Sequence, residues 1–127
     1  MTENEIATQI VDAAYKVHTN LGPGLLESVY EAVLAYELEK RGLGVQRQVS
    51  IPVTYEGIRF DVGFKADLLV EQRVIVELKS VERSQPVHRK QVLTYIRLAD
   101  LRLGLLINFG ANLIKDDIAR LVNQLPE

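Results

Sequence analysis

The sequence predicts an α/β domain with a mixed β-sheet flanked by helices. Two segments with apolar residues at helical spacing open the chain, segments with period-two alternation follow, and a strand–helix–strand pattern comes next. The chain has 127 residues and no repeats or linker-like segments. We therefore expect one domain over residues 1–127, with a single hydrophobic core.

The first two elements are expected to be helices, over residues 4–18 and 25–41. "NLGPG", at residues 20–24, separates them, and Gly42 is suited to end the second helix. In each segment the apolar residues recur at helical spacing. They are Ile6, Ile10, Ala13, Ala14 and Val17 in the first, and Leu26, Val29, Val33 and Tyr36 in the second.

Apolar residues then alternate with mostly polar ones, which is typical of strands. Residues 45–55 and 58–64 flank Glu56-Gly57 and predict a hairpin, in which Pro52 indicates an edge or a bulge. "KADLLV" at 65–70 and "RVIVELKS" at 73–80 predict two more strands around Glu71-Gln72-Arg73. Four strands are therefore expected in this part of the chain.

The second half predicts a βαβ unit. "SQP" at residues 84–86 opens a helix, and the continuous apolar run at 103–107 is typical of a central strand covered on both faces. The strands on either side of this helix should be parallel, with a right-handed crossover. The expected order is α-α-β-β-β-β-α-β; residues 111–127 could be a strand plus a turn or a short helix.

Composition excludes several classes of protein. The chain contains no cysteine, so it has neither disulfides nor a thiolate zinc site, and a reducing cytoplasm is the expected location. No apolar run approaches the roughly 18 residues of a membrane span, and the polar N-terminus does not resemble a signal peptide. The net charge of −2 argues against a strongly basic protein that coats nucleic acid, although a local basic face is compatible with it.

The segment "VIVELKS", residues 74–80, places Glu77 and Lys79 at the end of a strongly apolar strand. Residues two apart share one face of a strand. A three-residue loop after Val70 would place Asp67 directly opposite Glu77, whereas a two-residue loop would place it opposite Val76. The longer loop is favoured because "EQ" lacks the Gly or Asn of tight hairpin turns, although a non-glycine residue must then be left-handed.

Directly opposed carboxylates would repel each other, because their Cβ atoms would lie about 4.5–5.5 Å apart. A divalent cation such as Mg²⁺ would offset this repulsion. Lys79, on the same face as Glu77, could then hold a phosphate or polarise an attacking water, which is what phosphodiester hydrolysis requires. The alternative is an ordinary hairpin that carries exposed charges at its strand ends.

These residues resemble a known family. "ADLLVEQRVIVELKS" is similar to the core of the PD-(D/E)XK nuclease superfamily, and "GLLESVY", residues 24–30, is similar to the motif of the GxxExxY proteins, a bacterial and archaeal group within it. "VHTNLGPGLLESVYE", "PVHRKQVLTYI" and "GLLINFGA" also look like that group. The resemblance covers residues 5–123 and implies a restriction-endonuclease-like core.

The resemblance also implies a metal site. It assigns Mg²⁺ or Mn²⁺ to the side chains of Asp67 and Glu77, the main-chain carbonyl of Leu78, and Glu27 as a further acid. Lys79 would be the catalytic lysine. The implied activity is hydrolysis of DNA phosphodiester bonds. The alternative is a non-catalytic module that keeps the fold and binds nucleic acid or a protein, and a homo-oligomer is compatible with either function.

Four further residues are candidates for contacts with the substrate. Gln91 and Tyr95 form the Q-x-x-x-Y pattern of exonuclease-like branches of the superfamily, and their spacing puts both on one helical face. Tyr30 lies beside Glu27 on the second helix, and His88 lies close to Gln91. Each has a structural alternative: Tyr30 as a core aromatic, His88 as a helix cap, and Gln91 and Tyr95 as half-buried packing.

Overall fold

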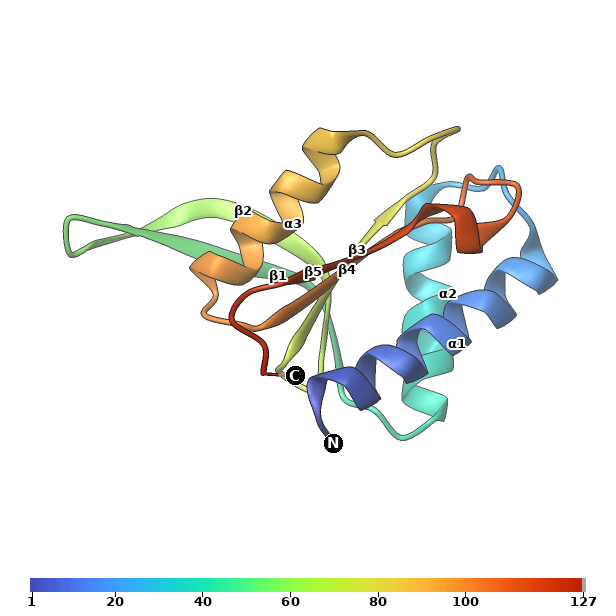
Figure 1. The fold of residues 1–127 in the computed structure, drawn as a ribbon, viewed down its shortest axis with the longest axis horizontal. Helices are drawn as coiled ribbons and strands as arrows, with labels where there is room; N and C mark the ends of the chain where they lie inside the picture. Colours follow the sequence, from blue (N-terminus) through green and yellow to red (C-terminus); the bar gives the residue numbers. More distant parts are fainter. Residues whose placement is uncertain (127) are drawn as a thin grey trace.

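A five-stranded sheet with helices on both faces forms the protein in a computed structural model, which describes residues 1–126 (Figure 1). The expected fold class is confirmed. Along the chain the elements are α1 (Glu3–Leu21), α2 (Glu27–Lys40), β1 (Val45–Tyr55), β2 (Ile58–Val70), β3 (Val74–Lys79), α3 (Pro86–Leu98), β4 (Leu103–Asn108), the 3₁₀ turn η1 (Ile114–Asp117) and β5 (Ile118–Val122).

The five strands are distributed along the chain differently from the sequence-based expectation. Residues 58–64 and 65–70 were expected to be separate strands, but they form the single strand β2, so three strands precede α3. Residues 111–127, left open between strand and short helix, contain both η1 and the fifth strand, and Glu127 lies outside the described residues. The observed order is therefore α-α-β-β-β-α-β-β, apart from η1.

The strands lie in the sheet in the order β1-β2-β3-β4-β5. Only β3 and β4 run parallel, as expected for strands joined through α3, and the other neighbouring pairs are antiparallel. Every residue of β4 is buried, and so is every residue of β3 before Lys79. Both strands are thus covered on both faces, which the unbroken apolar run at residues 103–107 predicts for β4.

Each face of the sheet has its own hydrophobic cluster. Helices α1 and α2 pack on the face that carries Val74, Val76 and Leu78. Helix α3 packs on the opposite face, where Ile96 meets Ile75 in a smaller cluster. Alternation along β3 therefore places Glu77, two residues after Ile75, on the face that α3 covers.

β1 and β2 extend beyond α3 as a two-stranded arm, seen in green in Figure 1. Its turn contains Glu56 and Gly57, both with positive φ, as the hairpin prediction requires. The bulge indicated by Pro52 is observed, because the β1–β2 register shifts between Ile51 and Val53. Several apolar side chains of the arm are exposed, namely Tyr55, Ile58, Phe60 and Val62.

None of the helices described within residues 1–126 is both long and apolar enough to cross a bilayer.

The bulge in the arm gives a test of the fold. A Cβ atom on Gly63 would lie 2.0 Å from the carbonyl oxygen of Ile51, so Gly63→Ala must displace the backbone of one strand. We expect this change to lower the free energy of unfolding by about 1–3 kcal/mol in urea denaturation. Val62→Thr, at the neighbouring position where the side chain is 88% exposed, is the control and should change it by less than about 0.5 kcal/mol. Equal stabilities of the two variants would contradict this account.

Candidate active site

The hairpin between β2 and β3 sets the position of the candidate acids. Val70 pairs with Val74, and Leu68 pairs with Val76, so the three-residue loop and its register are as expected. Two loop residues, Glu71 and Gln72, have positive φ values of 53° and 58°, where a single left-handed residue was expected. Gly44 stabilises this conformation, since it exchanges hydrogen bonds with the backbone N–H (2.8 Å) and carboxylate (2.7 Å) of Glu71.

The ladder between β2 and β3 ends just before the two acids. The register places Asp67 opposite Glu77, but their backbones do not pair. Instead the backbone N–H of Asp67 donates to Glu77 Oε1 (2.9 Å), and the backbone N–H of Leu78 donates to Asp67 Oδ2 (2.8 Å). Each carboxylate therefore accepts a hydrogen bond from the opposite strand, and the two side chains meet where the strands separate.

Burial and the charges of neighbouring acids raise the pKa of both Asp67 and Glu77. Glu77 is 8% exposed, and its desolvation together with the nearby charge of Asp67 raises the pKa of Glu77 to about 8, while the charge of Lys79 acts in the opposite direction. Burial also raises the pKa of Asp67, and the charges of Glu31 and Glu27 add to that effect. A cation placed between the two carboxyl groups would favour their ionised forms.

Lys79 is the last residue of β3 and is half-buried. Within residues 1–126 its side chain makes no hydrogen bond or ion pair with another side chain or with the backbone. Its backbone is fixed, because the N–H of Phe109 donates to the carbonyl oxygen of Lys79 (2.8 Å). The ammonium group thus has no protein partner among the described residues, while the backbone that carries it is bonded to the end of β4.

The loop after Lys79 is held by a buried polar network. Asp117 accepts hydrogen bonds from the backbone (2.8 Å) and hydroxyl of Ser84 and from the side chain of Asn108 (2.8 Å). The Asn108 amide also bonds both backbone groups of Val81. Burial alone would raise the pKa of Asp117, but these hydrogen bonds, together with the charge of Arg89, lower it below its usual value. The ionised Asp117 thus ties η1 to the segment that leads into α3.

Glu27, the first residue of α2, is exposed and lies close enough for its charge to affect Asp67. The larger effect on Asp67 comes from Glu31, a buried acid of α2 that the sequence-based assignment missed. A signal for it was present, because Glu31 follows Glu27 by four residues and so shares its helical face.

Tyr30 does not fit the expected role in substrate binding. Its ring is fully buried and stacks on Phe109 with centroids 4.6 Å apart. Its hydroxyl donates to the carbonyl oxygen of Gly22 (2.5 Å) and accepts from the backbone N–H of Leu25 (3.1 Å). Tyr30 is a core aromatic that fixes the loop before α2, which is the alternative considered for it.

His88 acts as a cap in the structure. Its Nδ1 accepts a hydrogen bond from the backbone N–H of Gln85 (3.0 Å) at the start of α3. This contact matches the alternative considered for His88, and it engages one of the two ring nitrogens.

Gln91 and Tyr95 line a groove of about 230 Å³ between α3 and β2. The ring of Tyr95 stacks on Phe64 with centroids 4.1 Å apart, and Lys90 and Thr94 supply further polar groups. Burial raises the pKa of Tyr95, and the charges of Glu77 and Asp67 raise it further, so this groove lies within electrostatic reach of the acids.

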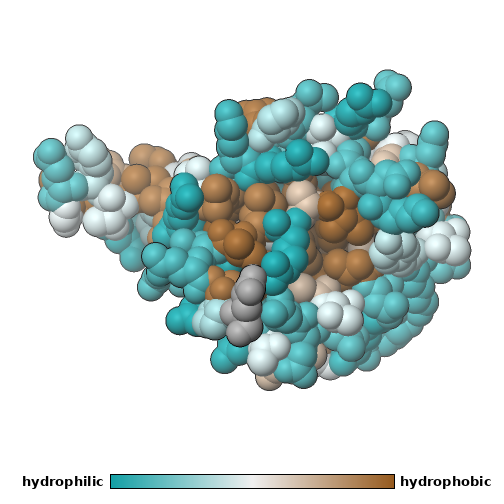
Figure 2. Space-filling view, in the orientation of Figure 1, coloured by the Kyte–Doolittle hydropathy of each residue, from teal (hydrophilic) through white to brown (hydrophobic). Residues whose placement is uncertain are grey.

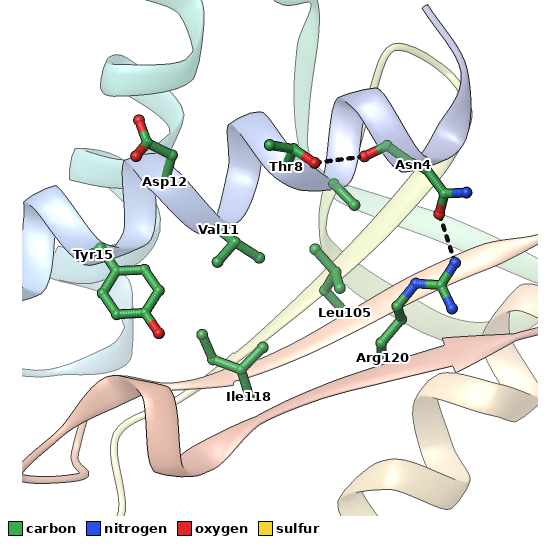
Figure 3. A pocket seen from close by; sticks show the side chains of 9 residues that line it. Asn4, Thr8, Val11, Asp12, Tyr15, Leu105, Ile118 and Arg120 are labelled. Atoms are coloured by element: carbon green, nitrogen blue, oxygen red, sulfur yellow. Dashed lines mark hydrogen bonds between the residues drawn. The ribbon is translucent and has the colours of Figure 1, made fainter.

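A second groove, of about 570 Å³, lies between α1 and β5 on the opposite face of the sheet (Figure 3). Its walls are mainly apolar, including Val11, Leu105 and Ile118, and Arg120 donates to Asn4 Oδ1 (2.5 Å) at its edge. Figure 2 shows apolar atoms exposed on this side of the molecule. None of the candidate site residues lines this groove.

The donor set of the site suits a hard cation. Asp67, Glu77 and the carbonyl of Leu78 offer only oxygen, which Mg²⁺ and Mn²⁺ prefer, and Mg²⁺ commonly binds one or two carboxylates and keeps several waters. In the conformation described for residues 1–126, no group of three or more His, Asp or Glu side chains is gathered as a metal site. The assignment of these ligands, and of Glu27 with them, stays a prediction.

The raised pKa of Glu77 predicts a dependence of stability on pH. Because the folded protein binds a proton at Glu77 that the unfolded chain releases near pH 4.5, stability should fall as pH rises from about 4.5 to 8. Glu77→Gln removes this loss, so in EDTA it should raise the free energy of unfolding at pH 9 by about 4 kcal/mol more than at pH 5. Urea denaturation measures this, with Glu82→Gln at an exposed position as control. The same difference from the native protein at both pH values would contradict the assignment.

Comparison with known proteins agrees with this geometry. The model of the PD-(D/E)XK nuclease superfamily matches residues 4–121. Neither a curated protein nor a solved structure matches the chain. The matched region runs from α1 to β5 and includes both facing acids and the lysine. The chain belongs to the PD-(D/E)XK nuclease superfamily.

Proposed function

We propose that the protein is a Mg²⁺- or Mn²⁺-dependent nuclease that hydrolyses DNA phosphodiester bonds. The observation that carries this proposal is the meeting of Asp67 and Glu77 where β2 and β3 separate, with Lys79 two residues beyond Glu77 on the same face. Membership of the nuclease superfamily supports the class of reaction.

Asp67, Glu77 and the Leu78 carbonyl would hold the cation, with Glu27 as an additional acid at its edge. The bound metal would lower the pKa of a coordinated water and stabilise charge on the phosphate. The carboxylates would orient that metal from two strands whose positions are set by backbone hydrogen bonds. Such fixed geometry matters because the ligands need no reorganisation when the substrate binds.

Lys79 would bind a non-bridging oxygen of the scissile phosphate or orient the attacking water. Its ammonium group makes no contact with an acid at ion-pair distance among the described residues, so it would be available to pair with the substrate phosphate. The charge developing on the phosphate would be stabilised from the same face as the metal.

The groove beside α3 would receive the DNA next to the scissile bond. Tyr95 and Phe64 offer an aromatic surface against which a base can stack, and the Gln91 amide can accept and donate hydrogen bonds. Lys90 adds a positive charge for a neighbouring phosphate. These side chains would allow DNA to bind close to the acids even though the net charge of the chain is −2.

A non-catalytic nucleic-acid- or protein-binding module is the alternative. It is favoured by the absence, within residues 1–126, of a group of three acids or histidines gathered for a metal, and by the raised pKa of Glu77, which favours its neutral form without a cation. In such a module Asp67 and Glu77 would serve only to hold β2 and β3 apart.

Substitution of Lys79 separates these functions. Lys79→Ala should lower cleavage of plasmid and linear DNA in Mn²⁺ by at least about 100-fold, because it removes a charge that acts in the transition state. Metal binding measured by calorimetry should persist in Lys79→Ala and be lost in Asp67→Asn. Lys115→Ala, at an exposed lysine on η1, is the matched control and should keep full activity. Undiminished cleavage by Lys79→Ala would refute the catalytic assignment, and DNA binding without any cleavage by the native protein would establish the module.

The groove beside α3 predicts a different effect. Lys90→Gln should raise KM for DNA about 3- to 10-fold with little change in kcat, since the lysine contacts a phosphate away from the reacting bond. Lys115→Gln makes the same change of charge outside the groove and should leave both constants unchanged. Steady-state cleavage of a fluorescent oligonucleotide gives both values. Equal KM values for the two variants would place the DNA elsewhere.

A further inference from the structure

Glu31 is an acid that the proposed reaction leaves without a role. It lies one turn after the start of α2 and is 7% exposed. Arg47 of β1 donates to Glu31 Oε2 through Nε (3.1 Å) and lies 3.0 Å from the same oxygen through Nη2. A buried carboxylate is costly unless it is paired and hydrogen-bonded, and Arg47 supplies one half of that requirement.

Gln48 supplies the other half and continues the contact to the candidate metal site. Its side-chain nitrogen donates to Glu31 Oε1 (2.5 Å) and to Asp67 Oδ1 (3.3 Å). Glu31 accepts but cannot donate when ionised, so it fixes which end of the amide faces the two acids. The amide nitrogen of Gln48 must therefore point at Asp67.

The backbone of Gln48 has an uncommon conformation that permits this contact. Its φ is 53°, a left-handed value inside a strand, although the flanking pairs Arg47–Leu68 and Val49–Ala66 keep one register. Gln48 itself does not pair with Asp67 through the backbone. Left-handed non-glycine residues are disfavoured and gather at functional sites, where surrounding contacts hold them.

Asp67 is consequently held at both carboxylate oxygens. Oδ2 accepts from the backbone of Leu78 at 2.8 Å, and Oδ1 accepts from Gln48. One contact comes from β3 and the other from β1, so the plane of the carboxylate is fixed from both neighbouring strands. Glu31 is a poor candidate for a metal ligand itself, because its negative charge is already paired with Arg47.

We propose that Glu31 and Gln48 are positioning residues that orient the Asp67 carboxylate for a divalent cation. This inference rests on the proposed function. Glu31 directs the Gln48 amide, and the amide directs Asp67. Hydrogen-bond partners of metal ligands commonly change metal affinity by about 10- to 100-fold when they are removed.

Two substitutions at Gln48 test the contact without removing a buried charge. Gln48→Asn keeps an amide and tolerates positive φ, but it is one methylene too short to reach both acids. Gln48→Gly removes the side chain and suits the left-handed backbone. Gln46→Asn, at an exposed glutamine on the same strand that bonds Gln72, is the matched control.

Calorimetric titration of the full chain with Mn²⁺ gives the first result, at a temperature where all variants are folded. Both Gln48 variants should bind Mn²⁺ about 10-fold more weakly than the native protein, while Gln46→Asn should bind it equally well. Activity assays should show a lower kcat at saturating metal with KM for DNA little changed. A residue that served only stability would leave the affinity of the folded protein for the metal unchanged.

A metal-free measurement separates this inference from the proposed function. In ¹H–¹⁵N NMR spectra without metal, both Gln48 variants should shift the amide resonance of Leu78, which bonds the Asp67 carboxylate, more than Gln46→Asn does. If the native protein neither binds Mn²⁺ nor cleaves DNA, the proposed function fails and this resonance alone decides whether Gln48 orients Asp67. Unchanged Leu78 resonances together with unchanged affinity would overturn the inference.

The order of the contacts gives a final check. Because Glu31 acts on Asp67 mainly through Gln48, Glu31→Gln should weaken Mn²⁺ binding more in the native background than in the Gln48→Gly background, where only the loss of its charge remains. Equal losses in both backgrounds would show that Glu31 acts independently of Gln48, and would overturn its assignment as the residue that directs the amide.

Discussion

The structure depends on two acids that face each other across separated strands. Asp67 and Glu77 could not occupy an ordinary ladder pair without strong repulsion at close range. The strands avoid this by giving up their backbone pairing at this point and by using the freed N–H groups of Asp67 and Leu78 as donors to the carboxylates. The polar backbone is thereby satisfied by the side chains themselves, and the two carboxyl groups remain facing each other where the strands separate.

Contacts elsewhere in the fold hold the end of β3 in this position. β3 is clamped on its other side by six parallel pairs with β4, which leaves its end little freedom to move. The network around Asp117 holds the following loop, and Gly104 lets α3 approach the sheet, since a Cβ there would lie 2.7 Å from a methyl group of Val92. Contacts with β4, with the Asp117 network and with α3 thus surround the site where Asp67 and Glu77 lose their backbone pairing.

The sequence predicts that Asp67 lies opposite Glu77, but it does not predict the contacts of Gln48 and Glu31 with Asp67. Strand alternation and a three-residue loop are enough to place Asp67 opposite Glu77, because both are local rules of backbone geometry. The left-handed backbone of Gln48 and its bridge to Glu31 depend on how α2 meets β1, which no local pattern specifies. The merging of residues 58–70 into one strand was missed because the alternation of large apolar residues over 58–64 stops at Lys65-Ala66, yet both parts of the segment pair with β1 as one strand.

Helix α2 contributes residues both to the core and to the surroundings of Asp67. Tyr30 points inward, where its ring stacks on Phe109 and its hydroxyl fixes the loop before the helix. The hydroxyl of Ser80, directly after Lys79, donates to the carbonyl oxygen of Leu25 in that same loop. The start of α2 is therefore bound to the end of β3, and Glu27 and Glu31, four residues apart on one helical face, are carried to the acids. Glu27 and Tyr30, three residues apart, thus have different roles. The charge of Glu27 raises the pKa of Asp67, and Tyr30 holds the start of α2 in place.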